Sequence, residues 1–158
     1  IKPGRAGVGR GSQVDFQVKM RDAGEDPETQ WPAGSYHKRI IGMPGDHVVM
    51  DDYTITVNGQ LVADCSPKAT TQRLKYDTWL CEGRIANGTD VISYQLTWGD
   101  PEIWMDGRRE WSLGDQEVLV FGDNLVESGD SRHRGPISIQ WIVGTVEPTP
   151  PLLSWLSP

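Results

Sequence analysis

The sequence predicts a mainly β fold: a twisted antiparallel sheet body with a smaller inserted lobe. Apolar residues occur in short runs that alternate with polar ones, as at Val14, Phe16 and Val18, and this alternation is typical of half-buried strands. Glycine and proline are frequent, at 18 and 11 of 158 residues, and are spread along the whole chain. No segment shows a long apolar repeat of the helical period, so we expect no long helix.

Single strands are expected where the alternation is clearest. Residues 53–57 and 60–63 flank Asn58-Gly59, the favoured pair for a tight type I′ turn, and should form an antiparallel hairpin. Residues 117–121 form an apolar run that is typical of a buried strand. Further strand-like patterns occur at 137–141 and 143–146.

The character of the chain changes near residues 63 and 116. Residues 1–62 and 117–158 carry the clear strand patterns and are predicted to form the β-body, whereas 63–116 is predicted to be the inserted lobe. That lobe holds both cysteines, four of the seven tryptophans and only weak strand signals. Cys65 and Cys81 are either free buried thiols or a disulfide, and the disulfide is favoured if the domain lies outside the cytoplasm.

Composition excludes several classes of function. Acidic residues outnumber basic ones by 22 to 15, for a net charge of -7, so we expect no nucleic-acid partner. The three histidines are scattered and no Cys-x-x-Cys pair occurs; no metal or cofactor is implied. No apolar run approaches the roughly 20 residues that span a bilayer. Because the chain starts at Ile1 without methionine, we expect it to be part of a longer protein.

Two polar clusters carry the candidate chemistry. In residues 36–46, the pair Lys38-Arg39 follows Tyr36-His37 and precedes two isoleucines, at the end of an expected strand. Residues 121–132 gather Asp, Asn, Ser and Arg directly after an expected buried strand. Taken alone, each cluster is better explained by ordinary turns and solvated charges.

Together the clusters resemble the signatures of type I signal peptidases. Residues 38–46 fit Lys-Arg-x-x-Gly-x-Pro-Gly-Asp, and residues 122–132 fit Gly-Asp-Asn-x-x-x-Ser-x-Asp-Ser-Arg, in the family order. The resemblance spans about residues 9–62 and 117–147 and leaves 64–116 uncovered. It implies a β-body of signal-peptidase type, with the catalytic domain formed by 1–62 and 117–158.

The resemblance also implies an activity, a location and a set of site residues. Such enzymes are serine endopeptidases of the bacterial inner (cytoplasmic) membrane, with a domain that faces the periplasm or the cell exterior. They remove signal peptides from secreted pre-proteins by a Ser/Lys dyad, in which a neutral lysine amine activates the serine. By this resemblance Lys38 is the general base, Ser128 orients its amine, and Tyr36 and His37 contact the substrate. The residues expected to support the site in a buried ion network are Arg39, Asp123, Asp130 and Arg132.

Some features depart from the family pattern. The family's nucleophile lies in a Ser-Met-x-Pro motif upstream of the Lys-Arg motif, and no such motif occurs here. We expect the nucleophile and the membrane anchor to lie upstream of Ile1, and this chain alone to be inactive. His37 stands where the family usually has an apolar residue, which leaves the side-chain preference of the substrate cleft open.

Two other functions share part of this pattern. A non-catalytic relative would bind peptides without cleaving them, but it would have no need of Lys38 and Ser128. A self-cleaving regulator domain uses the same dyad; Gly122-Asp123-Asn124 and the absence of a DNA-binding segment count against it.

Overall fold

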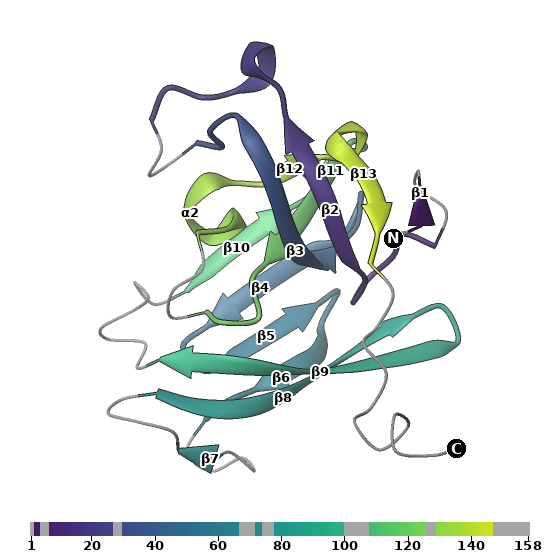
Figure 1. The fold of residues 1–158 in the computed structure, drawn as a ribbon. Coiled ribbons are helices and arrows are strands. Elements are labelled where there is room, and N and C mark those ends of the chain that lie inside the picture. The colour runs from purple at the N-terminus through teal and green to yellow at the C-terminus, as the bar shows by residue number, and fades with distance from the viewer. Residues whose placement is uncertain are drawn as a thin grey trace, which may run out of the picture.

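A computed structural model describes residues 2–3, 7–26, 30–66, 72–73, 78–99, 108–125 and 129–146 of the chain. These residues form two β-sheets whose named strands all pair antiparallel (Figure 1). The mainly β, antiparallel fold that the sequence predicts is therefore confirmed.

The first sheet carries the Lys-Arg motif. In spatial order it consists of β1 (Lys2–Pro3), β13 (Ile142–Thr145), β2 (Gln13–Val18), β3 (Gly34–Gly42), β11 (Glu117–Phe121) and β12 (Ile137–Ser138). The alternation of Val14, Phe16 and Val18 puts all three side chains on the buried face of β2. β3 lies between β2 and β11, so it is held from both sides in the middle of the sheet.

The second sheet contains the predicted Asn-Gly hairpin. Its order is β10 (Arg109–Ser112), β4 (His47–Asp51), β5 (Thr54–Val57), β6 (Gln60–Asp64), β8 (Thr78–Asn87) and β7 (Gln72–Arg73), and β9 (Asp90–Gly99) also pairs with β8. Val57 pairs with Gln60 across the two-residue turn. Asn58 and Gly59 have φ of 52° and 81°, as a type I′ turn requires, so the hairpin is confirmed.

Helical structure in the described residues is short. It consists of η1 (Met20–Asp22), α2 (Ser131–Arg134) and η2 (Ile139–Trp141). The strand expected at 137–141 is wrong beyond Ser138, because the Ser138 hydroxyl accepts a hydrogen bond from Gln140 N at 3.2 Å and caps a helical turn. Across the described ranges, no helix has the length and apolar character needed to cross a membrane.

Two apolar clusters stabilise the sheets. The inter-sheet cluster joins Ile41, Leu119 and Phe121 of the first sheet to the buried side chains of the second. The outer cluster covers the opposite face of the first sheet. Its buried members are Val14, Phe16, Val18, Trp31, Ile40, Val118, Val120, Ile137 and Ile142. Alternate residues of β3 therefore face two different environments, one on each side of the sheet.

The segment with weak strand signals forms long strands. β8 and β9 are 10 residues each and pair along their whole length, from Thr78 opposite Gly99 to Asn87 opposite Asp90. β8 also pairs with β6, through Ala63 and Gly83, so the second sheet continues across the boundary expected at residue 63. The division into body and inserted lobe stays a prediction.

Cys65 and Cys81 form a disulfide, the alternative that an extracytoplasmic location favours. Their Cα atoms are 5.5 Å apart, and both residues are buried in the inter-sheet cluster. The bond ties the residue after β6 to β8, and so fixes the base of the β8–β9 hairpin to the rest of the sheet.

Reduction of this disulfide should lower the free energy of unfolding by about 3 kcal/mol. This is the loss of unfolded-chain restriction expected for a loop as short as the one between Cys65 and Cys81. Urea unfolding of the oxidised and reduced wild-type protein measures the difference without changing a side chain. Thiol titration of the denatured, unreduced protein should detect no free thiol. Two titratable thiols, or equal unfolding midpoints in both redox states, would contradict the prediction.

Candidate active site

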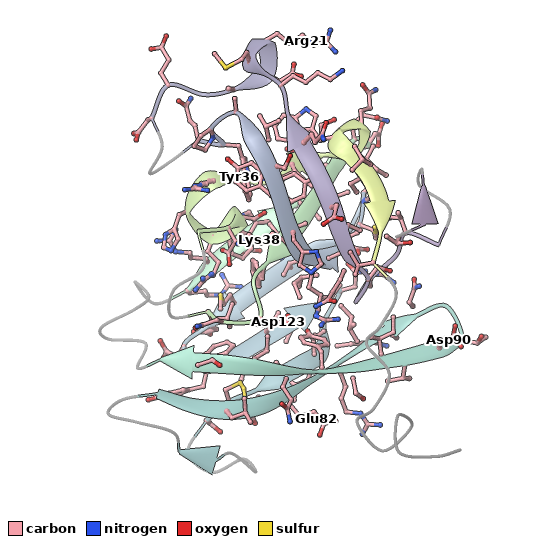
Figure 2. All side chains as sticks on the ribbon, in the orientation of Figure 1. Arg21, Tyr36, Lys38, Glu82, Asp90 and Asp123 are labelled. Atoms are coloured by element: carbon pink, nitrogen blue, oxygen red, sulfur yellow. A yellow bond between two sulfur atoms is a disulfide. The ribbon has the colours of Figure 1, made fainter. Side chains whose placement is uncertain are left out.

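Lys38 lies in the middle of β3, not at the end of a strand as the sequence analysis expects. Its cross-strand partner in β2 is the fully buried Val14. Because side chains alternate along a strand, Lys38 shares the outer-cluster face with Tyr36 and Ile40. The lysine side chain is half-buried there, beside α2 (Figure 2).

The surroundings of Lys38 favour its neutral form. Burial lowers the pKa of the Lys38 amine below its ordinary value, and this is the largest effect. The Asp130 carboxylate opposes the shift, whereas the Arg134 and Arg132 guanidinium groups add to it. The net result is a lysine that gives up its proton more readily than an exposed one.

An aromatic group adjoins this part of β3. Tyr36 stacks on Phe16 with ring centroids 5.2 Å apart, and Trp31 makes edge contacts with both, at 5.1 Å from Tyr36 and 5.2 Å from Phe16. The Tyr36 hydroxyl donates to Pro32 O at 2.6 Å, and Trp31 Nε1 donates to Gly135 O at 2.9 Å. The aromatic contacts thus connect β3 to the residue that ends α2, which rigidifies the side of the sheet that bears the lysine.

Arg39 points to the opposite face and fixes the loop that follows β11. Its Nε and Nη2 donate to the two carboxylate oxygens of Asp123, each at 2.8 Å, and Nη1 donates to Gly11 O at 2.8 Å. This is a bidentate pair of the geometry in which arginine binds carboxylates most strongly. The Arg39 side chain is 12% exposed and that of Asp123 is 35% exposed, so the guanidinium is largely shielded from water while the carboxylate is partly solvated.

Asp130 organises the other end of the same loop. It is fully buried and accepts from Arg132 Nε at 2.8 Å, from Arg132 Nη2 at 3.0 Å and from Gly122 N at 3.0 Å. It also caps α2 by accepting from Arg132 N at 3.1 Å. Ser131 Oγ accepts from Val120 N at 2.9 Å. The four residues expected in one ion network thus form two pairs, Arg39 with Asp123 and Arg132 with Asp130.

The last residue of the Lys-Arg motif has a structural position. Asp46 is 4% exposed and accepts from Arg10 Nε and Nη2 at 2.7 and 2.6 Å, from Met43 N at 2.9 Å and from Asn58 Nδ2 at 3.0 Å. Burial by itself raises the pKa of the Asp46 carboxyl, but the bonds from Arg10, Met43 and Asn58 hold it below its usual value. Asp46 therefore holds the connection between β3 and β4 in place.

Among the described residues, no strand pairs with the first half of β3 on the side away from β2, and this side is called the open edge. Toward β11 the strand is paired only from Arg39 to Gly42, whereas toward β2 it is paired from Gly34 to Arg39. The Ile40 N–H donates to Ser12 O, and Ile40 O accepts from Gly11 N. Both backbone groups of Ile40 therefore point toward the β2 side. Because backbone groups alternate in direction along a strand, Ser35 and His37 direct theirs toward the open edge.

A shallow pocket adjoins this part of the sheet. It has a volume of about 370 Å³ and is lined by Asp15, Phe16, Gln17, Ser35, Tyr36, His37 and Val143. His37 Nδ1 lies 2.9 Å from Asp15 Oδ1. Both expected substrate-contacting residues, Tyr36 and His37, thus line one pocket, together with residues of β2 and β13, on the β2 side of β3.

Ser128, the residue expected to orient the Lys38 amine, lies outside the described residues. The structure describes this loop as far as Leu125 and again from Gly129. Within the described ranges, no group of three or more His, Cys, Asp or Glu side chains is placed to hold a metal ion.

Comparison with known proteins identifies the family. The family model for signal peptidase, peptidase S26, matches residues 7–149. The chain is 31% identical over 112 residues to signal peptidase I of Bacillus caldolyticus, covering 71% of this chain and 51% of that protein. It is 29% identical over 140 residues to signal peptidase IB of Staphylococcus aureus, covering 89% and 59%.

A solved structure of signal peptidase I from Enterococcus faecalis V583 is also similar, with a TM-score of 0.48 and 17% identity over 87% of this chain and 95% of that one. The chain spans 51% to 59% of the length of the two curated relatives named above. The family model covers far more than half of this sequence. The chain therefore belongs to the signal peptidase family, peptidase S26.

Proposed function

We propose that this chain is the extracytoplasmic part of a serine endopeptidase that removes signal peptides from secreted pre-proteins, with Lys38 as its general base. The observation that carries the proposal is the placement of Lys38 on β3, half-buried against the outer cluster and with its pKa lowered by that burial. A protease of this family needs a lysine that is neutral at working pH, and an exposed lysine is not.

The proposed chemistry is acyl transfer to a serine. The neutral Lys38 amine takes the serine proton as the hydroxyl attacks the scissile carbonyl, and the resulting ammonium then returns a proton to the leaving amine. Ser128 would hydrogen-bond the amine and orient it, as the third member does in a catalytic triad. The two ion pairs hold Asp123 and Asp130, which lie near the two ends of the loop between β11 and α2.

We place the nucleophilic serine, and a membrane anchor, upstream of Ile1. Three described serines have other positions: Ser12 Oγ accepts from Gly9 N at 3.2 Å in a local turn, Ser35 lies on the face of β3 opposite Lys38, and Ser131 is 1% exposed and bonded to Val120 N. Such an anchor would hold the domain on the outer side of the bacterial inner membrane.

The open edge of β3 supports an extended substrate. A peptide that adds to this edge would bond to the backbone groups of Ser35 and His37, as peptides do when they extend a sheet. Its side chains would alternate between the two faces of the sheet, toward the side of Tyr36 and Lys38 on one face and the side of His37 on the other. Because His37 lies beside Asp15, one subsite would offer a polar surface.

The pH dependence of cleavage tests this proposal. In the protein extended upstream to include the serine, kcat/KM for a pre-protein should rise about tenfold per pH unit while Lys38 is mostly protonated, and level off above its pKa. Because burial lowers that pKa, the plateau should begin below the titration range of ordinary lysines. A rate that is flat across this range, or that falls as pH rises, would contradict a lysine base. Binding of signal peptides without cleavage would favour the non-catalytic alternative.

A further inference from the structure

The β8–β9 hairpin contacts the loop that follows β11, although its residues lie outside the motifs of the site. Thr97 N in β9 donates to Asp123 O at 2.8 Å, and Leu125 N donates to Thr97 O at 2.9 Å. Thr97 and Asn124 form a parallel bridge. In Figure 2, Asp123 lies between the strand that carries Lys38 and β9. The hairpin thus holds one side of the loop whose other side is held by Arg39.

Tyr94 of β9 completes this attachment through its ring. The Arg39 Cζ atom lies 4.5 Å from the centroid of the Tyr94 ring, within the range of a cation–π contact. The edge of the guanidinium is engaged by Asp123 and Gly11, so its flat face is left for the ring. Tyr94 is 6% exposed, and a contact of this kind gains strength when water is excluded.

The neighbouring strand makes room for the Tyr94 ring. Gly83 of β8 pairs directly with Tyr94, and a Cβ atom at Gly83 would lie 2.6 Å from the ring. The Tyr94 hydroxyl has no hydrogen-bond partner among the described residues. Burial raises the pKa of the Tyr94 phenol, which keeps it neutral. The ring, and not the hydroxyl, is therefore what Tyr94 contributes.

We propose that Tyr94 is a positioning residue for Lys38, acting through Arg39 and the loop that Arg39 holds. The proposal rests on the assignment of Lys38 as the base. Tyr94 restrains the Arg39 guanidinium, and the guanidinium restrains Asp123. The residue before Asp123, Gly122, donates its N–H to the Asp130 carboxylate beside Lys38. Loss of the ring frees the guanidinium to turn, and the loop and β3 then separate enough to admit water.

The direction of the effect follows from the groups that face Lys38. Among the described residues they include the Asp130 carboxylate and the guanidinium groups of Arg132 and Arg134, all in or next to α2, and the uncharged Val14 of β2. Burial is the largest cause of the lowered Lys38 pKa, so greater exposure to water moves that pKa back up toward its ordinary value.

The test measures the Lys38 pKa on the 158-residue chain itself, where no catalysis is needed. The rate at which a small acylating reagent modifies Lys38 is followed against pH by peptide mass spectrometry. Tyr94→Leu and Tyr94→Met should both raise the Lys38 pKa by about one unit, and Tyr94→Phe should leave it unchanged because it keeps the ring. Tyr94→Met keeps most of the buried volume and guards against loss of folding, which circular dichroism monitors.

Leu96→Ala is the matched control. Leu96 is 1% exposed and lies on the same buried face of β9, so its removal loosens packing without touching Arg39; the Lys38 pKa should stay lowered. An unchanged Lys38 pKa in Tyr94→Leu and Tyr94→Met, or an equal rise in Leu96→Ala, would overturn the proposed role of Tyr94. It would leave the assignment of Lys38 as the base untouched. An ordinary Lys38 pKa in the wild-type chain would instead overturn the base assignment, and the role of Tyr94 with it.

Discussion

Replacement of Lys38 by alanine, in the protein extended upstream to include the proposed serine, should lower kcat/KM for a pre-protein by about 10⁴-fold. Without the amine, the serine hydroxyl has no base to take its proton and remains a weak nucleophile. Lys38→Arg should be equally inactive, because a guanidinium keeps its proton at any pH that the protein survives. The measurement is the initial rate of signal-peptide release, followed by mass spectrometry.

Lys19→Ala provides the control for loss of a lysine, because Lys19 directly follows β2 and is exposed; its rate should equal that of the wild type. Ser128→Ala should retain more activity than Lys38→Ala, because the hydroxyl only orients the amine. Activity of Lys38→Ala close to that of the wild type would remove the lysine from the mechanism, and the second motif would then need another interpretation.

Replacement of Asp130 by alanine should lower the free energy of unfolding by about 3–5 kcal/mol, because it leaves a buried guanidinium without its partner. The Arg132 side chain is 2% exposed, and that of Asp130 is 0% exposed. The substitution also removes the acceptor for Gly122 N at 3.0 Å, which leaves a backbone donor unsatisfied. Urea unfolding of the 158-residue chain measures the loss.

Two further variants separate the buried charge from general effects of the substitution. Asp22→Ala removes the carboxylate of an exposed pair, in which the Arg21 side chain is 76% exposed, and should cost at most about 1 kcal/mol. The double variant Asp130→Ala/Arg132→Met removes both buried charges and should be more stable than Asp130→Ala alone. A loss for Asp130→Ala as small as that for Asp22→Ala would show that the pair is solvated.

Local patterns predicted the strands in which one face meets water. The alternation in β2 and the Asn58-Gly59 turn each depend only on residues that are close together in the sequence. Both were predicted correctly. In 137–141 the alternation was misleading. The hydrogen bond that Gln140 N donates to the Ser138 hydroxyl stabilises a helical turn in place of an extended strand. β3 ends at Gly42, three residues beyond Arg39, and the turn at Met43–Asp46 follows, so Lys38 lies inside the strand and not at its end.

The β8–β9 hairpin was missed because polar residues and a glycine interrupt it. Its sequence does contain a signal: Tyr94, Leu96 and Trp98 alternate, and all three are buried. The two motifs could be recognised from sequence, and their roles in the site stay predictions; the hydrogen-bond partners of their residues could not be predicted. Arg39 and Asp123 are 84 residues apart, and only the pairing of β3 with β11 brings them together. Trp31 stands in a polar stretch, and its burial depends on contacts with the stacked rings of β3 and β2.

We propose that Lys38 serves a serine that lies upstream of this chain. Two proteins test it most directly: the 158-residue chain, and the same chain extended upstream, each incubated with one pre-protein, with the new N-terminus of the product identified by mass spectrometry. Only the extended protein should cut, after a small residue at the end of the signal peptide. Cleavage by the 158-residue chain alone, or no cleavage by the extended protein with every residue intact, would contradict it.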